Sequence, residues 1–92
     1  MNYLLSMSPD AEDFLFSLQA KQFKQVAGAI FMLINDPFPN DSRILKGYTG
    51  FRRKDVGEYR IVYSVEDNIV MIDVIDKRND DSIYKRFDRK RS

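Results

Sequence analysis

Arg60 and Arg78 are the residues whose surroundings most clearly indicate chemistry, because each is a cation close to segments rich in Ile, Val and Tyr. Removing an unpaired charge from water is costly, so each guanidinium is expected to meet a specific anion. Tyr84, a polar aromatic residue, follows six positions after Arg78. The sequence contains no His and no Cys. This composition favours a phosphate backbone over a metal or a small acyl substrate as the anion.

The composition narrows the classes of function further. Without His, the sequence excludes His-based catalytic triads and His-ligated zinc, and without Cys it excludes disulfides and thiolate metal sites. We therefore expect no metal and no cofactor. Residues 1–42 hold 2 Lys or Arg against 5 acidic residues, whereas residues 43–92 hold 13 against 9. Such a one-sided basic surface favours a polyanionic partner.

The spacing of apolar residues changes from a helical to a strand period near Pro37, which predicts an α+β fold. Ser8 before Pro9 is typical of a helix start, and apolar stripes then predict two helices over residues 8–36. We expect one domain, residues 1–92, with a two-helix N-terminal hairpin, a small twisted antiparallel sheet and a short C-terminal helix, in the order β-α-α-β-β-β-α. The expected strands and final helix are Tyr3–Met7 at an edge, Ile44–Lys54 with turn or bulge points at Gly47 and Gly50, Tyr59–Val65, Ile69–Ile75, and Asp80–Arg91.

This order of elements is expected to gather cations at one end of the sheet. If the last two strands pair as an antiparallel hairpin, Arg78 lands near Arg60, and the run Arg52-Arg53-Lys54 belongs at the same end. Fixed guanidinium groups stabilise the charge that a phosphodiester gains in its transition state. Two plainer interpretations stay open. The basic run could be a solvated sheet edge, and Asp73 and Asp76 could simply pair with Arg60 or Arg78.

Two segments of the second half carry a resemblance to a known family. GEYRIVY and, after an apolar strand, KRNDDSIY together resemble the RelE branch of the RelE/ParE toxin superfamily. The resemblance implies a small twisted sheet that carries two N-terminal helices. It also implies a toxin that enters the ribosomal A site and cuts mRNA, with the nucleotide's own 2′-OH attacking the adjacent phosphate. An antitoxin protein encoded beside the toxin would bind and silence it.

The resemblance also implies roles for individual residues. Arg60 matches the arginine that holds the scissile phosphate, and Arg78 matches the arginine that stabilises the transition state or protonates the leaving oxygen. Tyr84 matches the tyrosine that stacks on, or helps activate, the attacked nucleotide. Arg53 is the best match among the family's basic strand residues. The other expected RNA contacts are Arg52, Lys54, Lys77 and Lys85.

The basic run departs from the family pattern. The family commonly alternates its basic residues, whereas this chain has three in succession, followed by Asp55. Strand alternation sends Arg53 to one face of the sheet and Arg52 and Lys54 to the other. The identity of the general base is therefore left open.

Alternative functions come from the same resemblance. A ParE-like inhibitor of DNA gyrase would use the fold as a binding module without cutting anything. An inactive relative would serve only as an antitoxin partner or a DNA-bound corepressor. For the leading interpretation we expect an antitoxin, the ribosome and mRNA as partners, with operator DNA bound only through the antitoxin complex. The sequence has neither an export leader nor a long apolar run, so we expect a cytoplasmic protein without membrane contact.

Overall fold

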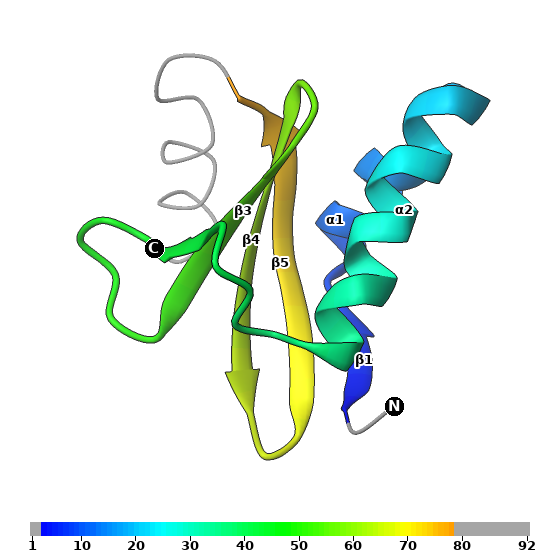
Figure 1. Ribbon diagram of the computed structural model, residues 1–92. Coiled ribbons are helices and arrows are strands. Elements are labelled where there is room, and N and C mark those ends of the chain that lie inside the picture. Colours follow the sequence, from blue (N-terminus) through cyan, green and yellow to red (C-terminus); the bar gives the residue numbers. More distant parts are fainter. Residues whose placement is uncertain (1–2, 79–92) are drawn as a thin grey trace.

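The computed structural model describes residues 3–78 and has an α+β architecture, as predicted. Two helices lie on one side of a five-stranded sheet (Figure 1). The predicted helix Asp80–Arg91 lies outside the described residues. The elements in chain order are β1 (Leu4–Met7), α1 (Pro9–Phe16), α2 (Ala20–Asn35), β2 (Ser42–Ile44), β3 (Phe51–Val56), β4 (Tyr59–Glu66) and β5 (Ile69–Lys77).

The strand order is β1-β5-β4-β3-β2, with β1 at one edge as predicted and β2 at the other. Three ladders are antiparallel, whereas β1 runs parallel to β5. Ser8, at the junction of β1 and α1, holds the end of β1 against β5. Its backbone N–H donates to Ile72 O over 2.9 Å, and its hydroxyl donates to Asp73 O over 2.7 Å and accepts from Ala11 N. One residue thus caps α1 and fastens the end of β1 to the middle of β5.

The segment predicted as a single strand, Ile44–Lys54, is instead a hairpin of two strands, and that part of the prediction is wrong. Gly47 and Gly50 adopt φ angles of 84° and 90°, a region that favours glycine. The two glycines reverse the chain between β2 and β3, so they are turn points, as the sequence indicated. The sheet consequently gains a short edge strand in which Ser42 is buried and Arg43 and Ile44 are exposed.

Strand alternation gives the sheet two different faces. The face that the helices cover, called the helix face here, buries the larger core, in which Ile30 and Leu33 of α2 pack with Tyr63 of β4. The Tyr63 hydroxyl is satisfied there because it donates to Pro37 O over 2.6 Å.

The opposite face, called the open face, has a smaller core. Leu45, which follows β2, is fully buried against Val62 and Val74, with Tyr48 and Phe51 beside them. Burying a side chain of this size contributes about 2 kcal/mol. The loop after β2 thus covers the middle of the open face, while the end near the β3–β4 turn stays accessible. Within residues 3–78, neither helix is long and apolar enough to cross a membrane.

Candidate functional site

Three arginines surround one carboxylate at the accessible end of the open face. We call Arg53, Arg60 and Arg78 the arginine cluster. Arg60 grips Asp55 with two hydrogen bonds, Nε to Oδ1 at 2.7 Å and Nη2 to Oδ2 at 3.3 Å. Arg78 Nε lies 3.5 Å and Arg53 Nη1 lies 3.7 Å from Asp55 Oδ2. The predicted convergence of Arg60, Arg78 and Arg53 is therefore present in the fold.

The strand register explains the convergence. Asp55 of β3 and Arg60 of β4 are directly opposite in the ladder, and Arg53 lies two residues earlier on the same face of β3. Tyr59 is opposite Lys77, so Arg78 emerges just beyond the end of β5. Three segments of the chain thus deliver one guanidinium each to the same point.

The β3–β4 turn holds Arg78 in place. The backbone N–H of Arg78 donates to Glu58 O over 2.8 Å, and its Nη1 donates to Gly57 O over 3.0 Å. Gly57 has a φ of 57°, and a Cβ added there would lie 2.6 Å from Gln25 Nε2 on α2. The turn therefore lies between the helix layer and Arg78; its positive φ favours glycine, and a Cβ there would also require the flexible end of the Gln25 side chain to move.

The electrostatics of the site follow from the excess of guanidinium over carboxylate charge. Arg60 lowers the pKa of the Asp55 carboxyl, first by hydrogen bonding and then by its charge; Arg78 and Arg53 add to the effect, and burial opposes it in part. Asp55 is therefore ionised at neutral pH. The arginine cluster together with Asp55 carries a net charge of about +2, because arginine stays protonated in proteins. Such an arrangement can bind a phosphate and stabilise added negative charge on it.

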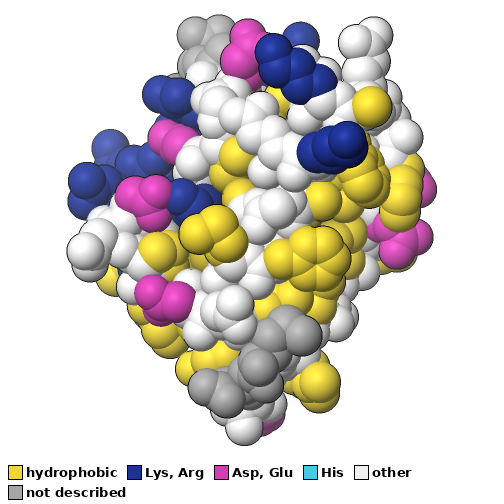
Figure 2. Space-filling model, turned by 45° about the vertical axis from the view of Figure 1, so that its right-hand side comes forward, with side chains coloured by type: hydrophobic (Ala, Val, Ile, Leu, Met, Phe, Trp, Pro, Cys, Tyr) yellow, Lys and Arg dark blue, Asp and Glu magenta, His cyan; other side chains and the backbone are white. Residues whose placement is uncertain are grey.

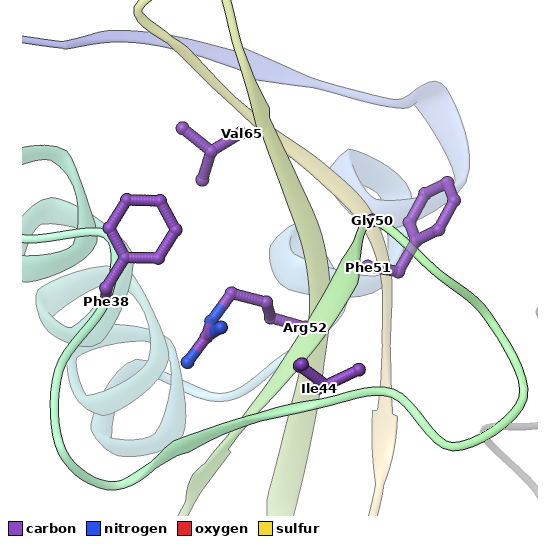
Figure 3. A pocket seen from close by; sticks show the side chains of 6 residues that line it. All are labelled: Phe38, Ile44, Gly50, Phe51, Arg52 and Val65. Carbon is purple, nitrogen blue, oxygen red and sulfur yellow. The ribbon is translucent and has the colours of Figure 1, made fainter.

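Arg52 and Lys54 point the other way, to the helix face, as strand alternation predicts. Arg52 donates through Nε and Nη2 to Ser42 Oγ at 3.2 and 2.9 Å, and its guanidinium lies 5.2 Å from the centre of the Phe38 ring. Figure 3 shows Arg52 and Phe38 on one side of β3 and Phe51 on the other. Lys54 pairs with Asp41. Both cations thus have local partners, and their contact with RNA stays a prediction.

Of the remaining predicted site residues, Lys77, Tyr84 and Lys85, the structure describes only Lys77. Lys77 is exposed at the end of β5, opposite Tyr59. Tyr84 and Lys85 lie outside the described residues. The roles predicted for these three residues therefore stay predictions.

Asp55 is the site residue whose role the sequence did not indicate. The sequence offered Asp73 and Asp76 as partners for the arginines; all three arginines approach Asp55, and Asp76 lies directly opposite Arg60 in the β4–β5 ladder. A signal was present, since Val56 and Tyr59 flank a two-residue turn, and an antiparallel hairpin must then place Asp55 opposite Arg60 as the next pair. Asp73 lies instead at the register shift between β4 and β5, where its Oδ2 accepts from Ser64 Oγ over 3.5 Å.

Several solved structures of similar fold are described as toxins or toxin–antitoxin complexes. A free mutant form of the E. coli toxin RelE has a TM-score of 0.79 at 19% identity, covering 98% of each chain. A chain of the RelE-RelB complex from Pyrococcus horikoshii OT3 has a TM-score of 0.75 at 24% identity, covering 86% of this chain and 98% of that one. A chain of the toxin-antitoxin complex RelBE2 from Mycobacterium tuberculosis has a TM-score of 0.73 at 23% identity, covering 85% and 100%. These likenesses establish the fold.

A comparison of sequence with family models gives a further result. Residues 5–81 match the model described as the ParE toxin of the type II toxin-antitoxin system, parDE. The search of curated proteins found no matching sequence. The family model spans most of the chain and includes all three residues of the arginine cluster. The chain therefore belongs to the ParE toxin family of type II toxin–antitoxin systems, and the predicted membership of the RelE/ParE superfamily is confirmed.

Proposed function

We propose that this toxin is an endoribonuclease that cleaves mRNA in the ribosomal A site and so stops translation. The observation that carries the proposal is the convergence of Arg53, Arg60 and Arg78 at one accessible point of the open face. The three guanidiniums outnumber the two nearby carboxylates of the open face, Asp55 and Asp76, and so leave an excess of positive charge where a substrate phosphate can approach.

The chemistry needs no group beyond the chain and the RNA. The 2′ oxygen attacks the adjacent phosphorus, the bond from phosphorus to the 5′ oxygen breaks, and a 2′,3′-cyclic phosphate and a 5′-hydroxyl end result. The 2′-OH gives up one proton and the leaving oxygen takes one. Arg60 and Arg53 would hold the phosphate, and Arg78 would offset the charge of the transition state. Tyr84 would stack on the attacked nucleotide.

A cognate antitoxin is the proposed protein partner, and the cytoplasm is the proposed location. Two of the similar structures are described as complexes with an antitoxin. On this chain Phe31 and Met32 of α2 are 60% and 71% exposed, and Figure 2 shows hydrophobic side chains gathered in the middle of one face. An apolar segment of the antitoxin would cover this surface, while an acidic segment would mask the arginine cluster.

The gyrase inhibitor is the second candidate, because the family whose model matches is named for ParE. The two candidates differ in their nucleic-acid product. Primer extension on cellular mRNA after induction should detect new 5′ ends within codons for a ribonuclease, whereas a gyrase inhibitor should leave mRNA intact and break DNA.

A matched pair of variants completes this experiment. Arg60→Ala should abolish the new mRNA ends, and Lys21→Ala, which removes an exposed cation in the helix layer, should leave them. DNA breaks without mRNA ends in the wild type would replace the ribonuclease proposal with the gyrase candidate.

A further inference from the structure

We propose that Asp55 is an internal substitute for the substrate phosphate: it occupies the arginine cluster in the RNA-free protein and is displaced when RNA binds, so that it limits the affinity for RNA. This inference rests on the proposed function and assigns a regulatory group to the same site. Its physical basis lies in three features of the cluster, namely which guanidinium edge Asp55 occupies, how exposed the contact is, and what else holds the arginines.

The first feature is the edge of Arg60 that Asp55 occupies. Its Nε and Nη2 bind the two carboxylate oxygens in the side-by-side geometry with which arginine also grips two oxygens of a phosphate. The guanidiniums of Arg53 and Arg78 both approach the Oδ2 atom of Asp55. A carboxylate at the focus of three guanidiniums thus stands where an incoming phosphodiester would gain most from them. The phosphate and Asp55 compete for the same donors.

The second feature is accessibility. The side chains of Arg60, Asp55 and Arg78 are 16%, 32% and 47% exposed. A ligand can therefore reach Arg78 and Asp55 from solvent and then replace the carboxylate on Arg60. An ion pair that is partly open to water contributes little to stability. Replacing the Asp55 carboxylate by a phosphate therefore costs little free energy.

The third feature is that the arginines have other supports. Arg78 is held by its hydrogen bonds to Gly57 O and Glu58 O, neither of which involves Asp55. Arg53 and Arg60 are directed to the open face by the β3–β4 register. Loss of the carboxylate therefore leaves the cluster assembled while its net charge rises from about +2 to about +3. If Asp55 served only to position the arginines, its loss would displace them.

The consequence can be tested on binding alone, without cleavage. We choose Asp55→Asn because the amide keeps an oxygen acceptor for Arg60 and removes only the charge. The probe is a short single-stranded DNA oligonucleotide, which has the phosphates but lacks the attacking 2′-OH. Asp55→Asn should bind it about three- to tenfold more tightly at low salt, because one unit of charge a few ångströms from a phosphate is worth that much in water. The gain should shrink at high salt.

Asp67→Asn is the matched control. It makes the same change of residue and net charge at the β4–β5 turn, about 23 Å away along β4, where Asp67 has a φ of 52° that Asn also tolerates. The control should bind the oligonucleotide like the wild type. Equal or weaker binding by Asp55→Asn, with both proteins folded by circular dichroism, overturns the inference, and so does an equal gain in both variants.

A second measurement reports the displacement directly. Sulfate, which stays doubly charged across the titration range of a carboxyl, is added to the wild type while the side-chain carboxyl carbon of Asp55 is titrated by NMR. The pKa of Asp55 should rise toward its ordinary value as sulfate removes its guanidinium partners. An unchanged pKa of Asp55 at saturating sulfate would show that the anion does not replace the carboxylate.

These outcomes separate the inference from the proposed function. Tighter binding by Asp55→Asn together with intact cellular mRNA supports the internal anion and rejects the nuclease. Cleaved mRNA with no gain in binding supports the nuclease and rejects the internal anion. A protein that binds neither probe and leaves cellular mRNA intact rejects both.

Discussion

The two faces of β3 carry similar cations in very different surroundings. On the open face, Arg53 joins two more arginines, and the three share Asp55. On the helix face, Lys54 has Asp41 as its partner, and Arg52 is held by Ser42 and Phe38. On the open face three guanidiniums therefore meet at one carboxylate, while on the helix face each cation has its own partner, an anion for Lys54 and a neutral hydroxyl and aromatic ring for Arg52. The comparison indicates that the convergence of several guanidiniums on one accessible point, and not the number of basic residues, distinguishes a phosphate site from a structural contact.

The largest effect is expected at Arg78. Arg78→Ala should lower mRNA cleavage by about 10²–10³, or about 3–4 kcal/mol, because it removes a preorganised donor that acts in the transition state. Its partial exposure predicts little change in the free energy of unfolding. Cleavage by purified protein on programmed ribosomes measures the first effect, and urea unfolding measures the second. Arg78→Lys should recover only part of the rate, since an ammonium lacks the fork that reaches both Gly57 O and Asp55.

A smaller effect is expected at the turn that supports Arg78. Gly57→Ala should lower the free energy of unfolding by about 1–2 kcal/mol, because its φ of 57° disfavours a Cβ and Gln25 stands in the way. Cleavage per folded molecule should also fall, since Gly57 O anchors Arg78. Thermal unfolding and cleavage test both effects. In a Gln25→Ala background the destabilisation should shrink; an unchanged cost would mean that the packing against α2 is unimportant.

On the helix face, Ser42→Ala should affect stability alone. The hydroxyl accepts from Arg52 and donates to Pro39 O over 3.0 Å, and its loss should cost about 1 kcal/mol. Cleavage per folded molecule should match the wild type. A clear loss of cleavage in a stable Ser42→Ala protein would mean that both faces of β3 contribute to one catalytic site. It would contradict the distinction between the two faces.

The smallest effect is a difference in acid stability. The pKa of Asp55 is lowered in the folded protein by Arg60 and its neighbours, and that of Asp41 is lowered by Lys54. Each contributes stability above the unfolded value near 3.8 that is lost as the pH falls through the folded pKa. Urea unfolding from about pH 6 to pH 2 should show a flatter pH dependence for Asp55→Asn than for Asp41→Asn, because three cations act on Asp55. The reverse order would contradict the geometry of the cluster.

Much of this arrangement could be predicted from the sequence. The helical and strand periods predicted the helices, β4 and β5, and alternation separated Arg53 from Arg52 and Lys54. These features depend on local patterns that the fold does not override. Two features could not be predicted in the same way. The hairpin within residues 44–54 depends on the burial of Leu45 against the open face of the sheet. The role of Asp55 depends on a cross-strand register that also brings Arg78 from a third segment of the chain.

The most direct test of the central claim uses two neighbouring residues. Arg53→Ala and Arg52→Ala remove the same side chain from opposite faces of β3, and each is compared with the wild type for codon-level mRNA cleavage at matched expression and for urea unfolding. Arg53→Ala should lose at least about tenfold in cleavage with a stability within about 0.5 kcal/mol of the wild type. Arg52→Ala should lose about 1–2 kcal/mol of stability and keep its cleavage per folded molecule. Equal losses of cleavage in the two variants, or a loss confined to Arg52→Ala, would contradict the assignment of the open face as the catalytic site.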